Sequence, residues 1–474
     1  MTRKLLARAL ALLLAGGAAA VLIADPSAIE RAMFGGSFVR NMVSDETGLP
    51  TEWDVKTGKN VKWWADVGSQ AYAGPVVAGG QVFVGTNNDG QRNLEEPNDR
   101  GVVMAFGEKD GAFLWQKTHE KLAAGRIHDW PQQGVCSTPA IEGDRLWYTS
   151  NRATMVCLKT DGSPVWEYDM MAELDVFPHN LAVSSPLIVD GVLYVTTGNG
   201  VDEGHVNVPV PMAPSFIALK ADTGELLWEN ALPGENILHG TWSNPAYGVI
   251  QGRAQVIFPG GDGWVYSLEP KTGEVLWKFD ANPKDSKWVL GGRGTRNNLI
   301  ATPVIWEDRV YIGVGQDPEH GEGVGNFWCI DATLEGDVTE TGKVWHRGGD
   351  EFYRTISTVA IHDGILYSSD LSGFLYALDA RTGEHFWTYD LLAAVWGSPY
   401  VADGRVYIGD EDGDVAILKA GKTMELIAEP NMGVSVYSTP VAKDGVLYVL
   451  GRNRVFALQE GASGPPSTRR RHGQ

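Results

Sequence analysis

The chain has 474 residues, of which 43% are hydrophobic, and it is rich in glycine (58) and tryptophan (17). A chain of this length can form one very large domain or about three ordinary ones, each with a substantial core. Its formal net charge of −20 argues against nucleic acid or an anionic membrane surface as the main partner.

The N-terminus has the pattern of an export signal. Basic residues precede the apolar run 9–24, ALALLLAGGAAAVLIA, as the positive and hydrophobic regions of such a signal do. The run is slightly short for a membrane span of about 20 residues. We therefore expect residues 1–24 to be a signal peptide or an uncleaved N-terminal anchor, followed by a lead-in at 25–56. Either way the protein is expected to be exported, as a periplasmic protein or one anchored facing the periplasm.

One phrase recurs along the chain. It reads LKADTGELLW at 219–228, LEPKTGEVLW at 268–277 and LDARTGEHFW at 378–387. Each copy predicts two short strands joined by a turn at Thr-Gly, where glycine tolerates the positive φ of a tight hairpin. Drifted copies end at other tryptophans, namely Trp63, Trp115, Trp166 and Trp345.

A second phrase alternates with the first. It consists of a small residue, usually a proline, an apolar pair, a glycine turn and an alternating strand, as in SPLIVDGVLYVTTG at 185–198. Eight copies begin at Gly74, Thr138, Ser185, Asn244, Thr302, Ser357, Ser398 and Thr439. Their spacing matches the roughly 40–60 residues expected for a propeller blade.

Together the two phrases predict units of four strands, in which A and B come from the second phrase and C and D surround the Thr-Gly turn. The eighth unit has no D strand of its own, and the orphan segment 61–63 can supply it. A ring closed in this way has no exposed sheet edge. We therefore predict an all-β fold, an eight-bladed β-propeller over 57–460 that is closed by an N-terminal strand in the last blade. The Pro-, Ser- and Arg-rich remainder, 461–474, is predicted to be a disordered basic tail.

The tryptophan phrase, with the pattern Ala/Leu-x-Asp-x-x-Thr-Gly-x-x-x-Trp, resembles the tryptophan-docking repeat of the PQQ-like propellers. That superfamily includes the quinoprotein alcohol dehydrogenases, which use pyrroloquinoline quinone (PQQ), and the lipoprotein of the outer-membrane β-barrel assembly machine. The resemblance covers about 61–459. It implies that the repeated tryptophans pack between adjacent blades: Trp63, Trp115, Trp166, Trp228, Trp277, Trp345 and Trp387.

Loop lengths distinguish the two faces of the predicted disc. In a four-stranded antiparallel blade the D–A and B–C connections emerge on one face, and the A–B and C–D connections on the other. The A–B and C–D connections are expected to be uniformly short turns. The long, irregular loops lie at 121–135, 170–183, 198–215, 235–242, 281–301 and 315–326. Because binding residues concentrate on long loops, we expect the D–A/B–C face to be the working face.

Polar and aromatic side chains collect in these loops. Five of the ten histidines lie there: His128, His179, His205, His239 and His320. The stretch GGRGTRNN at 291–298 has the features of an anion nest, in which glycines free backbone N–H groups and arginines fork onto carboxylates. An arginine pair that bridges blades is the alternative. For a small, planar, polyanionic ligand such as PQQ, the candidate binding residues are Arg293, Arg296, Asn297, Asn298, Trp242 and His239.

Two of the loops have metal-ligand chemistry. The sequences GVDEGH at 200–205 and DPEHGEG at 317–323 combine the oxygens that Ca²⁺ prefers with the histidine and carboxylate groups that suit a transition metal. Neither matches a specific metal signature, and acidic loop residues that cap turns are the alternative. The candidate ligands are Asp202, Glu203, His205, Asp317, Glu319 and His320.

Two functions are open. The first is a binding or scaffolding module that holds a protein partner, or a small polyanionic ligand, on the loop-rich face. The second, implied by the resemblance, is a PQQ- and calcium-dependent quinoprotein oxidoreductase of the alcohol dehydrogenase type. For it, the position of the residues in the loops makes Asp317 or Asp202 the candidate catalytic base.

The cysteines favour the first function. The dehydrogenases of the superfamily carry a disulfide between adjacent cysteines, whereas Cys136, Cys157 and Cys329 stand apart from one another and are predicted to be buried free thiols. We therefore expect a non-catalytic, monomeric binding protein. It is expected to bind no nucleic acid and to meet a membrane only through an uncleaved N-terminal segment.

Overall fold

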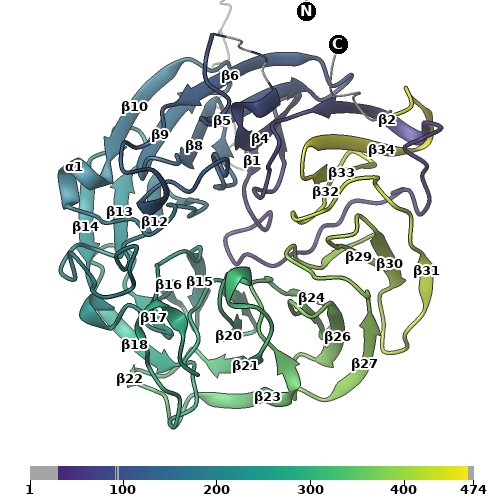
Figure 1. The fold of residues 1–474 in the computed structure, drawn as a ribbon. Helices are drawn as coiled ribbons and strands as arrows, with labels where there is room; N and C mark the ends of the chain where they lie inside the picture. Colours follow the sequence, from purple (N-terminus) through teal and green to yellow (C-terminus); the bar gives the residue numbers. More distant parts are fainter. Residues whose placement is uncertain (1–29, 91, 93–94, 468–474) are drawn as a thin grey trace, which may run out of the picture.

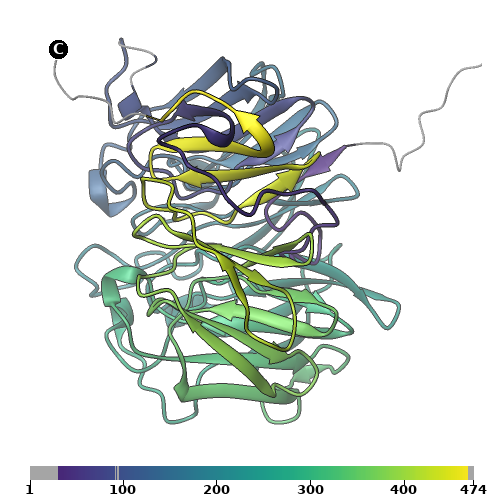
Figure 2. The same cartoon turned by 90° about the vertical axis from the view of Figure 1, so that its right-hand side faces the viewer.

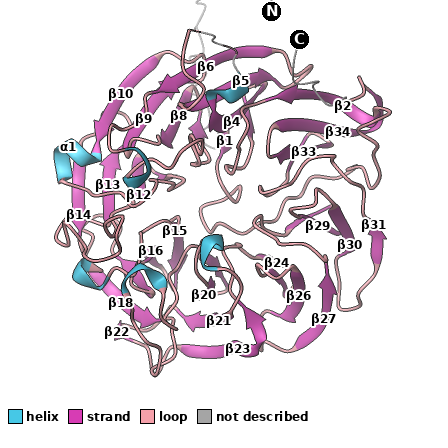
Figure 3. Ribbon diagram, viewed as in Figure 1, coloured by secondary structure: helices cyan, strands magenta, loops and turns pink. Residues whose placement is uncertain are grey.

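The computed structural model describes residues 30–467 except 91, 93 and 94. Eight sheets surround a central axis as the blades of a propeller (Figure 1), and strands make up the body of every blade (Figure 3). The prediction of an all-β, eight-bladed propeller is confirmed. The expected signal or anchor at 1–24, and residues 468–474 of the expected tail, lie outside the described residues.

Blades 1 to 4 follow one another along the chain. Blade 1 contains β3 (Val76–Ala78), β4 (Gln81–Asn87), β5 (Gly101–Gly107) and β6 (Phe113–His119). Blade 2 contains β7 (Ala140–Glu142), β8 (Arg145–Thr149), β9 (Thr154–Lys159) and β10 (Pro164–Asp169). Blade 3 contains β11 (Leu187–Val189), β12 (Val192–Thr196), β13 (Phe216–Lys220) and β14 (Leu226–Asn230). Blade 4 contains β15 (Ala246–Ile250), β16 (Arg253–Pro259), β17 (Trp264–Leu268) and β18 (Val275–Asp280).

Blades 5 to 8 complete the ring. Blade 5 contains β19 (Val304–Trp306), β20 (Arg309–Val314), β21 (Val324–Asp331) and β23 (Lys343–Tyr353). Blade 6 contains β24 (Ala360–His362), β25 (Ile365–Ser369), β26 (Phe374–Asp379) and β27 (His385–Asp390). Blade 7 contains β28 (Tyr400–Ala402), β29 (Arg405–Gly409), β30 (Val415–Lys419) and β31 (Leu426–Ala428). Blade 8 contains β32 (Val441–Lys443), β33 (Val446–Gly451), β34 (Arg454–Ser463) and β2 (Lys59–Asp66).

The helical segments are short and lie on the D–A and B–C connections. They are α1 (Met170–Leu174) and the 3-10 turns Asn88–Gly90, Gly125–Ile127, Gly234–Asn236, Leu290–Gly292 and Pro318–His320. Figure 2 shows these segments along one face of the molecule and the purple strand β1 (Arg31–Ala32) on the other. The irregular structure is therefore concentrated on the face that the loop lengths single out.

The two ends of the propeller close the ring as predicted. β2 pairs antiparallel with β34, and Trp63 lies opposite Ala457. The purple β2 and the yellow β34 lie side by side in Figure 1. β34 continues to Ser463, past the boundary expected at 460.

The repeated tryptophan and the Thr-Gly turn form one contact between neighbouring blades. Nε1 of Trp228 donates a hydrogen bond to the carbonyl of Pro270, 2.8 Å away in the C–D turn of the next blade. Gly273 of that turn has a φ of +72°, and a Cβ there would lie 2.7 Å from the Trp228 ring. The same pairing joins Trp63 to Gly111, Trp115 to Gly162, Trp166 to Gly224 and Trp345 to Gly383. The docking implied by the resemblance is therefore present, and it explains why the repeat conserves both partners within this chain.

Two tryptophans depart from this series. Trp387 donates to the carbonyl of Gly421 at 2.9 Å, but a Cβ on Gly421 would have nothing within 4 Å. Trp277 departs further. Its Nε1 donates to the side chain of Gln255 in its own blade, at 2.8 Å. The connection that follows in blade 5, 332–342, is not the short turn expected, because it contains β22 (Gly336–Asp337). β22 pairs parallel to β18 with Gly336 beside Trp277. The expectation that every C–D connection is short is wrong at this blade.

The lead-in at 30–50 crosses the A–B face close to the axis (Figure 1, purple). β1 pairs with β7 of blade 2, and Val43 forms a parallel bridge with Val401 of blade 7. The lead-in has a hydrogen bond to each blade, at Gly79, Gly143, Ser185, Tyr247, Ile305, Ile361, Val401 and Gly445. One segment therefore ties all eight blades together.

Arg40 anchors this segment in the protein interior. Its side chain is fully buried and donates to the carbonyls of Pro245 at 2.8 Å, Phe34 at 2.7 Å and Ser185 at 3.1 Å. Burial lowers the pKa of Arg40 to about 9, so the guanidinium still carries its charge at neutral pH. Charge-assisted hydrogen bonds to three carbonyls offset part of the desolvation of that charge.

Candidate functional site

A funnel of about 330 Å³ opens near the axis, among the D–A and B–C loops. Its wall includes the residue two positions before the pre-strand small residue in every copy of the second phrase, where the small residue of the sixth copy is Thr358, next to Ser357. These eight residues are Tyr72, Cys136, Val183, Trp242, Ile300, Ile356, Trp396 and Tyr437. Residues two apart in an extended segment point the same way, so the eight repeats build one largely apolar ring.

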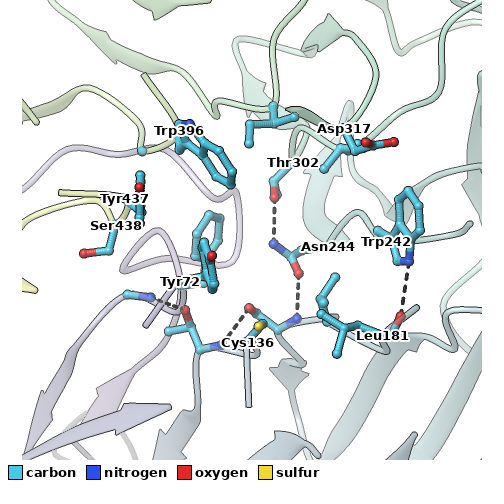
Figure 4. A pocket seen from close by; sticks show the side chains of 18 of the residues that line it. Tyr72, Cys136, Leu181, Trp242, Asn244, Thr302, Asp317, Trp396, Tyr437 and Ser438 are labelled. Atoms are coloured by element: carbon cyan, nitrogen blue, oxygen red, sulfur yellow. Dashed lines mark hydrogen bonds between the residues drawn. The ribbon is translucent and has the colours of Figure 1, made fainter. Parts of the chain in front are cut away.

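Aromatic rings dominate one side of this wall (Figure 4). Tyr72 stacks on Trp396 with ring centroids 5.8 Å apart, and on Tyr437 with centroids 5.5 Å apart. Trp242 stands across the funnel from them. Of the described residues that line the funnel, only Asp317 and Glu319 carry a charge. The funnel therefore offers flat apolar surface together with two carboxylates.

A belt of polar side chains lies at the base of the wall. The N–H of Thr138 donates to the hydroxyl of Ser185 at 3.0 Å, and the N–H of Thr358 donates to that of Ser398 at 2.9 Å. Asn244 accepts from Ser185 and donates to the hydroxyl of Thr302 (Figure 4). The same kind of hydrogen bond, from a backbone N–H to a side-chain hydroxyl, joins Gly74 to Thr138, Thr302 to Thr358 and Ser398 to Thr439. These polar groups are engaged between blades, which explains the small polar residue at the start of the phrase.

Beside the funnel, three histidines from three different loops meet at their Nε2 atoms. Nε2 of His205 lies 3.2 Å from Nε2 of His239 and 3.4 Å from Nε2 of His179. The His239 ring is 4.9 Å from the ring of Trp242, which lines the funnel. His179 and His239 are buried and His205 is half-buried.

The hydrogen bonds at Nδ1 show which ring nitrogen carries the proton in His179 and in His239. Nδ1 of His179 is 2.8 Å from the carbonyl of Val201, which can only accept, so Nδ1 carries the proton. Nδ1 of His239 is 3.0 Å from Oδ2 of Asp317 and donates to this carboxylate. In the neutral form of each ring, Nε2 then has a free lone pair. Nδ1 of His205 is buried and has no hydrogen-bond partner among the described residues.

Asp317 links this cluster to a fourth histidine. Its Oδ2 accepts from Nδ1 of His320 at 2.9 Å, and Nε2 of His320 donates to the carbonyl of Gly291 at 2.7 Å. The bond to Asp317 raises the pKa of His320. Burial opposes the charge on Asp317, but the hydrogen bonds from His239 and His320 outweigh burial and hold its pKa well below the ordinary value. Burial lowers the pKa of His179 to about 3 and also lowers that of His205.

Backbone contacts between the loops hold the three histidines in place. Gly200 forms an antiparallel bridge with Gly240, and the N–H of Val201 donates to the carbonyl of His239 at 2.9 Å. The N–H of His179 donates to the carbonyl of Gly198 at 3.2 Å. A Cβ on Gly200 would lie 2.5 Å from the His239 carbonyl oxygen. Glycine is required there because the loops approach so closely.

The predicted anion nest has a different role. Arg296 forks onto the carboxylate of Asp280, at 2.7 and 3.1 Å, and Arg293 is exposed. Asn297 accepts from Arg354 at 3.0 Å, and Asn298 donates to the carbonyl of Gly240 at 2.9 Å. Arg293, Arg296, Asn297 and Asn298 are absent from the described lining of the funnel. Three of these four side chains hold loops together.

The predicted metal ligands divide into two groups. His205, Asp317 and His320 belong to the histidine cluster described above. Asp202 instead caps its own loop by accepting from the N–H groups of Val206 and Asn207, at 2.7 and 3.2 Å. Glu203 is paired with Arg126 at 3.3 Å, and Glu319 lines the funnel. The structure does not bring Asp202 and Glu203 together with Asp317 and Glu319 around one point.

PQQ does not fit the charges of the funnel. A polyanionic quinone needs cationic partners, whereas the charged groups that line the described part of the funnel are the carboxylates of Asp317 and Glu319. Arg296, the best placed of the predicted cations, is already neutralised by Asp280. Without a bridging cation, these carboxylates would repel the carboxylates of such a ligand.

Sequence reasoning missed His179 as a site residue and the funnel role of Tyr72. A signal was present for both. His179 and His239 precede the belt residues of successive blades, Ser185 and Asn244, by six and five positions. Tyr72 occupies the same repeat position as Trp396 and Tyr437. Aligning the copies on their small residues would have exposed this pattern. Cys136 shares the Tyr72 position and is half-buried rather than buried, whereas Cys157 and Cys329 are buried, and all three are free thiols.

The family model described as outer membrane protein assembly factor BamB matches residues 99–347 and 337–463, which is most of the propeller. The chain belongs to this family. The resemblance to PQQ-like propellers is thereby confirmed.

Relatives of this BamB-family chain include proteins of both kinds that the resemblance implies. BamB of Moranella endobia (strain PCIT) is 23% identical over 388 residues, which cover 78% of this chain and 87% of that protein. The crystal structure of BamB from Moraxella catarrhalis has a TM-score of 0.57 at 16% identity, and the match covers 83% of this chain and 98% of that one. The dehydrogenase subunit of the quinone-dependent alcohol dehydrogenase of Gluconacetobacter polyoxogenes is 27% identical over 144 residues, 30% of this chain and 17% of that protein.

The sequence matches cover more of this chain for BamB than for the dehydrogenase subunit. The structures do not separate the two, since a europium-containing methanol dehydrogenase has a TM-score of 0.60 at 14% identity and the match covers 88% of both chains. The structural likeness, at this level of identity, shows the fold. Within the part of the chain that the structure describes, no helix is long and apolar enough to span a bilayer.

Proposed function

We propose that this BamB-family chain is an exported, non-catalytic scaffold that takes part in the assembly of outer membrane proteins by binding a protein partner in its funnel. The observation that carries the proposal is the apolar ring of eight wall residues, with the stacked Tyr72, Trp396 and Tyr437 on one side. Large aromatic side chains in concave, desolvated positions contribute most to protein–protein affinity.

The lining also indicates which segment of a partner fits. A volume of about 330 Å³ accommodates a few side chains and is too small for a folded domain. Glu319 favours a cationic neighbour, whereas the carboxylate of Asp317 is already engaged by His239 and His320. The partner segment is therefore an extended peptide that inserts an aromatic or aliphatic side chain and carries lysine or arginine beside it.

Exposed apolar side chains on the same face extend the surface for such a partner. Val206, Met212 and Leu392 are 71%, 78% and 86% exposed, and each lies in a B–C or D–A loop. Trp288 and Val289 in the loop between blades 4 and 5 are also exposed. Each of these side chains can add apolar contact area for a partner that extends beyond the funnel.

A labelled peptide tests the binding step. We expect a fluorescent peptide with one phenylalanine flanked by arginines to bind the wild-type protein. Replacing either its phenylalanine or its arginines by aspartate should weaken binding. Trp396→Ala should reduce the affinity roughly tenfold or more, the loss of an aromatic anchor, in fluorescence anisotropy. Phe113→Ala, which removes an exposed aromatic side chain from an outer strand, is the matched control and should change nothing. Equal binding to wild type and Trp396→Ala would refute the funnel as the docking site.

A deletion strain tests the cellular role. Loss of the chain should lower the amount of β-barrel proteins in the outer membrane, and the wild-type chain should restore it, whereas Trp396→Ala should not. Cell fractionation of the strain that carries the restored wild-type chain should find the chain outside the cytoplasm. Unchanged barrel proteins after deletion would contradict the assembly role.

The partial similarity to quinone-dependent alcohol dehydrogenases makes a quinoprotein the alternative. A ligand present at 100 times its dissociation constant adds about 2.7 kcal/mol to the free energy of unfolding. Because the funnel lacks a described cation, we expect no rise in melting temperature with PQQ, with or without Ca²⁺. A saturable, calcium-dependent rise would instead establish the quinoprotein.

A further inference from the structure

The three converging histidines have the spacing of metal ligands. Imidazole nitrogens bound to one tetrahedral zinc ion at about 2.0–2.1 Å lie roughly 3.3–3.4 Å from one another. The Nε2 atom of His205 lies 3.2 Å from that of His239 and 3.4 Å from that of His179. All three nitrogens lie within 4.8 Å of one another. One ion can therefore contact all three rings with little movement of the side chains.

The protons in the cluster are also placed for metal binding. His179 and His239 hold their Nδ1 protons on the Val201 carbonyl and on the Asp317 carboxylate, so their lone pairs point to the common centre. Metal-bound histidines characteristically donate their other N–H to a carbonyl or a carboxylate in this way. Among the described residues, Nε2 of His205 has hydrogen-bond contacts only with His179 and His239, and its Nδ1 has no hydrogen-bond partner. Its Nε2 is free to act as the third donor.

We propose that His179, His205 and His239 bind one divalent transition-metal ion of the zinc class. Three neutral imidazoles suit zinc, copper or nickel, whereas calcium takes oxygen ligands. Of the ligands expected from the two acidic loops, for calcium or a transition metal, this site keeps only His205, and it goes beyond the proposed scaffold role.

His320 does not belong to the ligand set. Both of its ring nitrogens point at acceptors, Oδ2 of Asp317 and the carbonyl of Gly291, so it has no lone pair to offer. It instead orients Asp317, which in turn orients His239. Asp317 and His320 are therefore positioning residues for the metal ligand.

The site lies where it can influence the funnel. His239 contacts Trp242, and Asp317 reaches the funnel lining. Three protein ligands leave a coordination position on a tetrahedral ion for a water molecule or another donor. The ligands come from the loops between blades 2 and 3, within blade 3, and between blades 3 and 4, so the ion also ties these loops together.

Isothermal titration with Zn²⁺ tests the proposal on tag-free protein that has been stripped with a chelator. We expect one ion to bind per chain and Ca²⁺ not to compete. Co²⁺ should give the strong visible absorption of a tetrahedral site. His205→Asn should weaken zinc binding on the order of 100-fold, and Asp317→Asn should weaken it about 10- to 100-fold by removing the negative charge from the Nδ1 partner of His239.

The controls separate loss of the site from loss of the fold. His205 has a φ of +54°, which asparagine tolerates, so His205→Asn should retain the melting temperature of the metal-free protein. His385→Asn removes an exposed histidine of β27 and should bind zinc as the wild type does. Absence of zinc binding by the wild type, or unchanged binding by His205→Asn, would overturn the proposal. Neither result depends on the peptide or deletion experiments, so the metal site and the scaffold role can fail separately.

Discussion

His119 shows how burial sets the charge of a side chain in this propeller. It ends β6 of blade 1, and its Nε2 lies 2.7 Å from the hydroxyl of Tyr148 in β8 of blade 2. The side chain is only 7% exposed, and burial lowers its pKa to about 3. The neutral ring therefore accepts a hydrogen bond from the Tyr148 hydroxyl, and this bond links the two blades.

This pKa predicts a loss of stability in mild acid. The ordinary pKa is 6.5 and the folded value about 3, so the unfolded chain takes up the proton first as the pH falls. Stability is fully present above pH 6.5 and decreases progressively towards pH 3. Between pH 7 and pH 5 the wild type should lose about 2 kcal/mol more than His119→Gln, measured by urea unfolding at both pH values. Parallel losses in the two proteins would contradict a depressed pKa at His119.

At the scale of the element, the contact between a tryptophan and the next C–D turn is repeated around the ring. It combines an Nε1 hydrogen bond to a backbone carbonyl with close packing of the indole on a glycine of positive φ, as in Trp228 and Gly273. A buried indole removes a large apolar area from water and satisfies its N–H in the same contact. The Thr-Gly turn is therefore needed by the neighbouring blade as well as by its own hairpin.

Gly273→Ala tests this account. It should lower the free energy of unfolding by about 1–2 kcal/mol because alanine disfavours the positive φ, and by a further 1–3 kcal/mol or so because its Cβ meets the Trp228 ring. Gly404→Ala is the matched control, since Gly404 has a φ of +68° and nothing within 4 Å of a Cβ. It should show only the first loss. Equal losses in the two variants, measured by denaturant unfolding, would rule out the docking contact as a stabilising interaction.

At the scale of the whole molecule, the lead-in connects blades that are far apart in the sequence. It hydrogen-bonds to all eight blades, and its Phe34 lines both the funnel and a second cavity, which the lead-in itself borders. β2, which follows it, closes the ring. The N-terminal part of the chain thus joins blades that are far apart in sequence.

Arg40→Met tests how much this segment contributes to the free energy of unfolding. It keeps much of the side-chain volume but leaves three carbonyls without their donor. We expect the free energy of unfolding to fall by about 3 kcal/mol or more. Arg31→Met, at a half-exposed ion pair with Glu142, should change it by less than about 1 kcal/mol. An Arg40→Met variant as stable as Arg31→Met would show that the lead-in is not a structural anchor.

The repeats made the fold predictable, because each copy has the same local sequence pattern. Hairpin turns, alternating strands and the docking tryptophan all act over a few residues or between adjacent blades. The unpaired segment 61–63 predicted the closure that β2 and β34 form. The long connection 332–342 and the path of the lead-in lie outside the repeat, and neither was predicted.

The sequence by itself determined the eight blades, their closure and the face that carries the long loops, since these follow from periodic patterns and from loop lengths. Only the tertiary structure decided which loop side chains meet. His179, His205 and His239 are far apart in the chain, and their nitrogens come together through backbone contacts between loops that no local pattern encodes. The tertiary structure also decided the partner of Arg296. Its ion pair with Asp280 leaves Arg296 unavailable to a ligand. Long-range packing, rather than residue type, selects the members of a site.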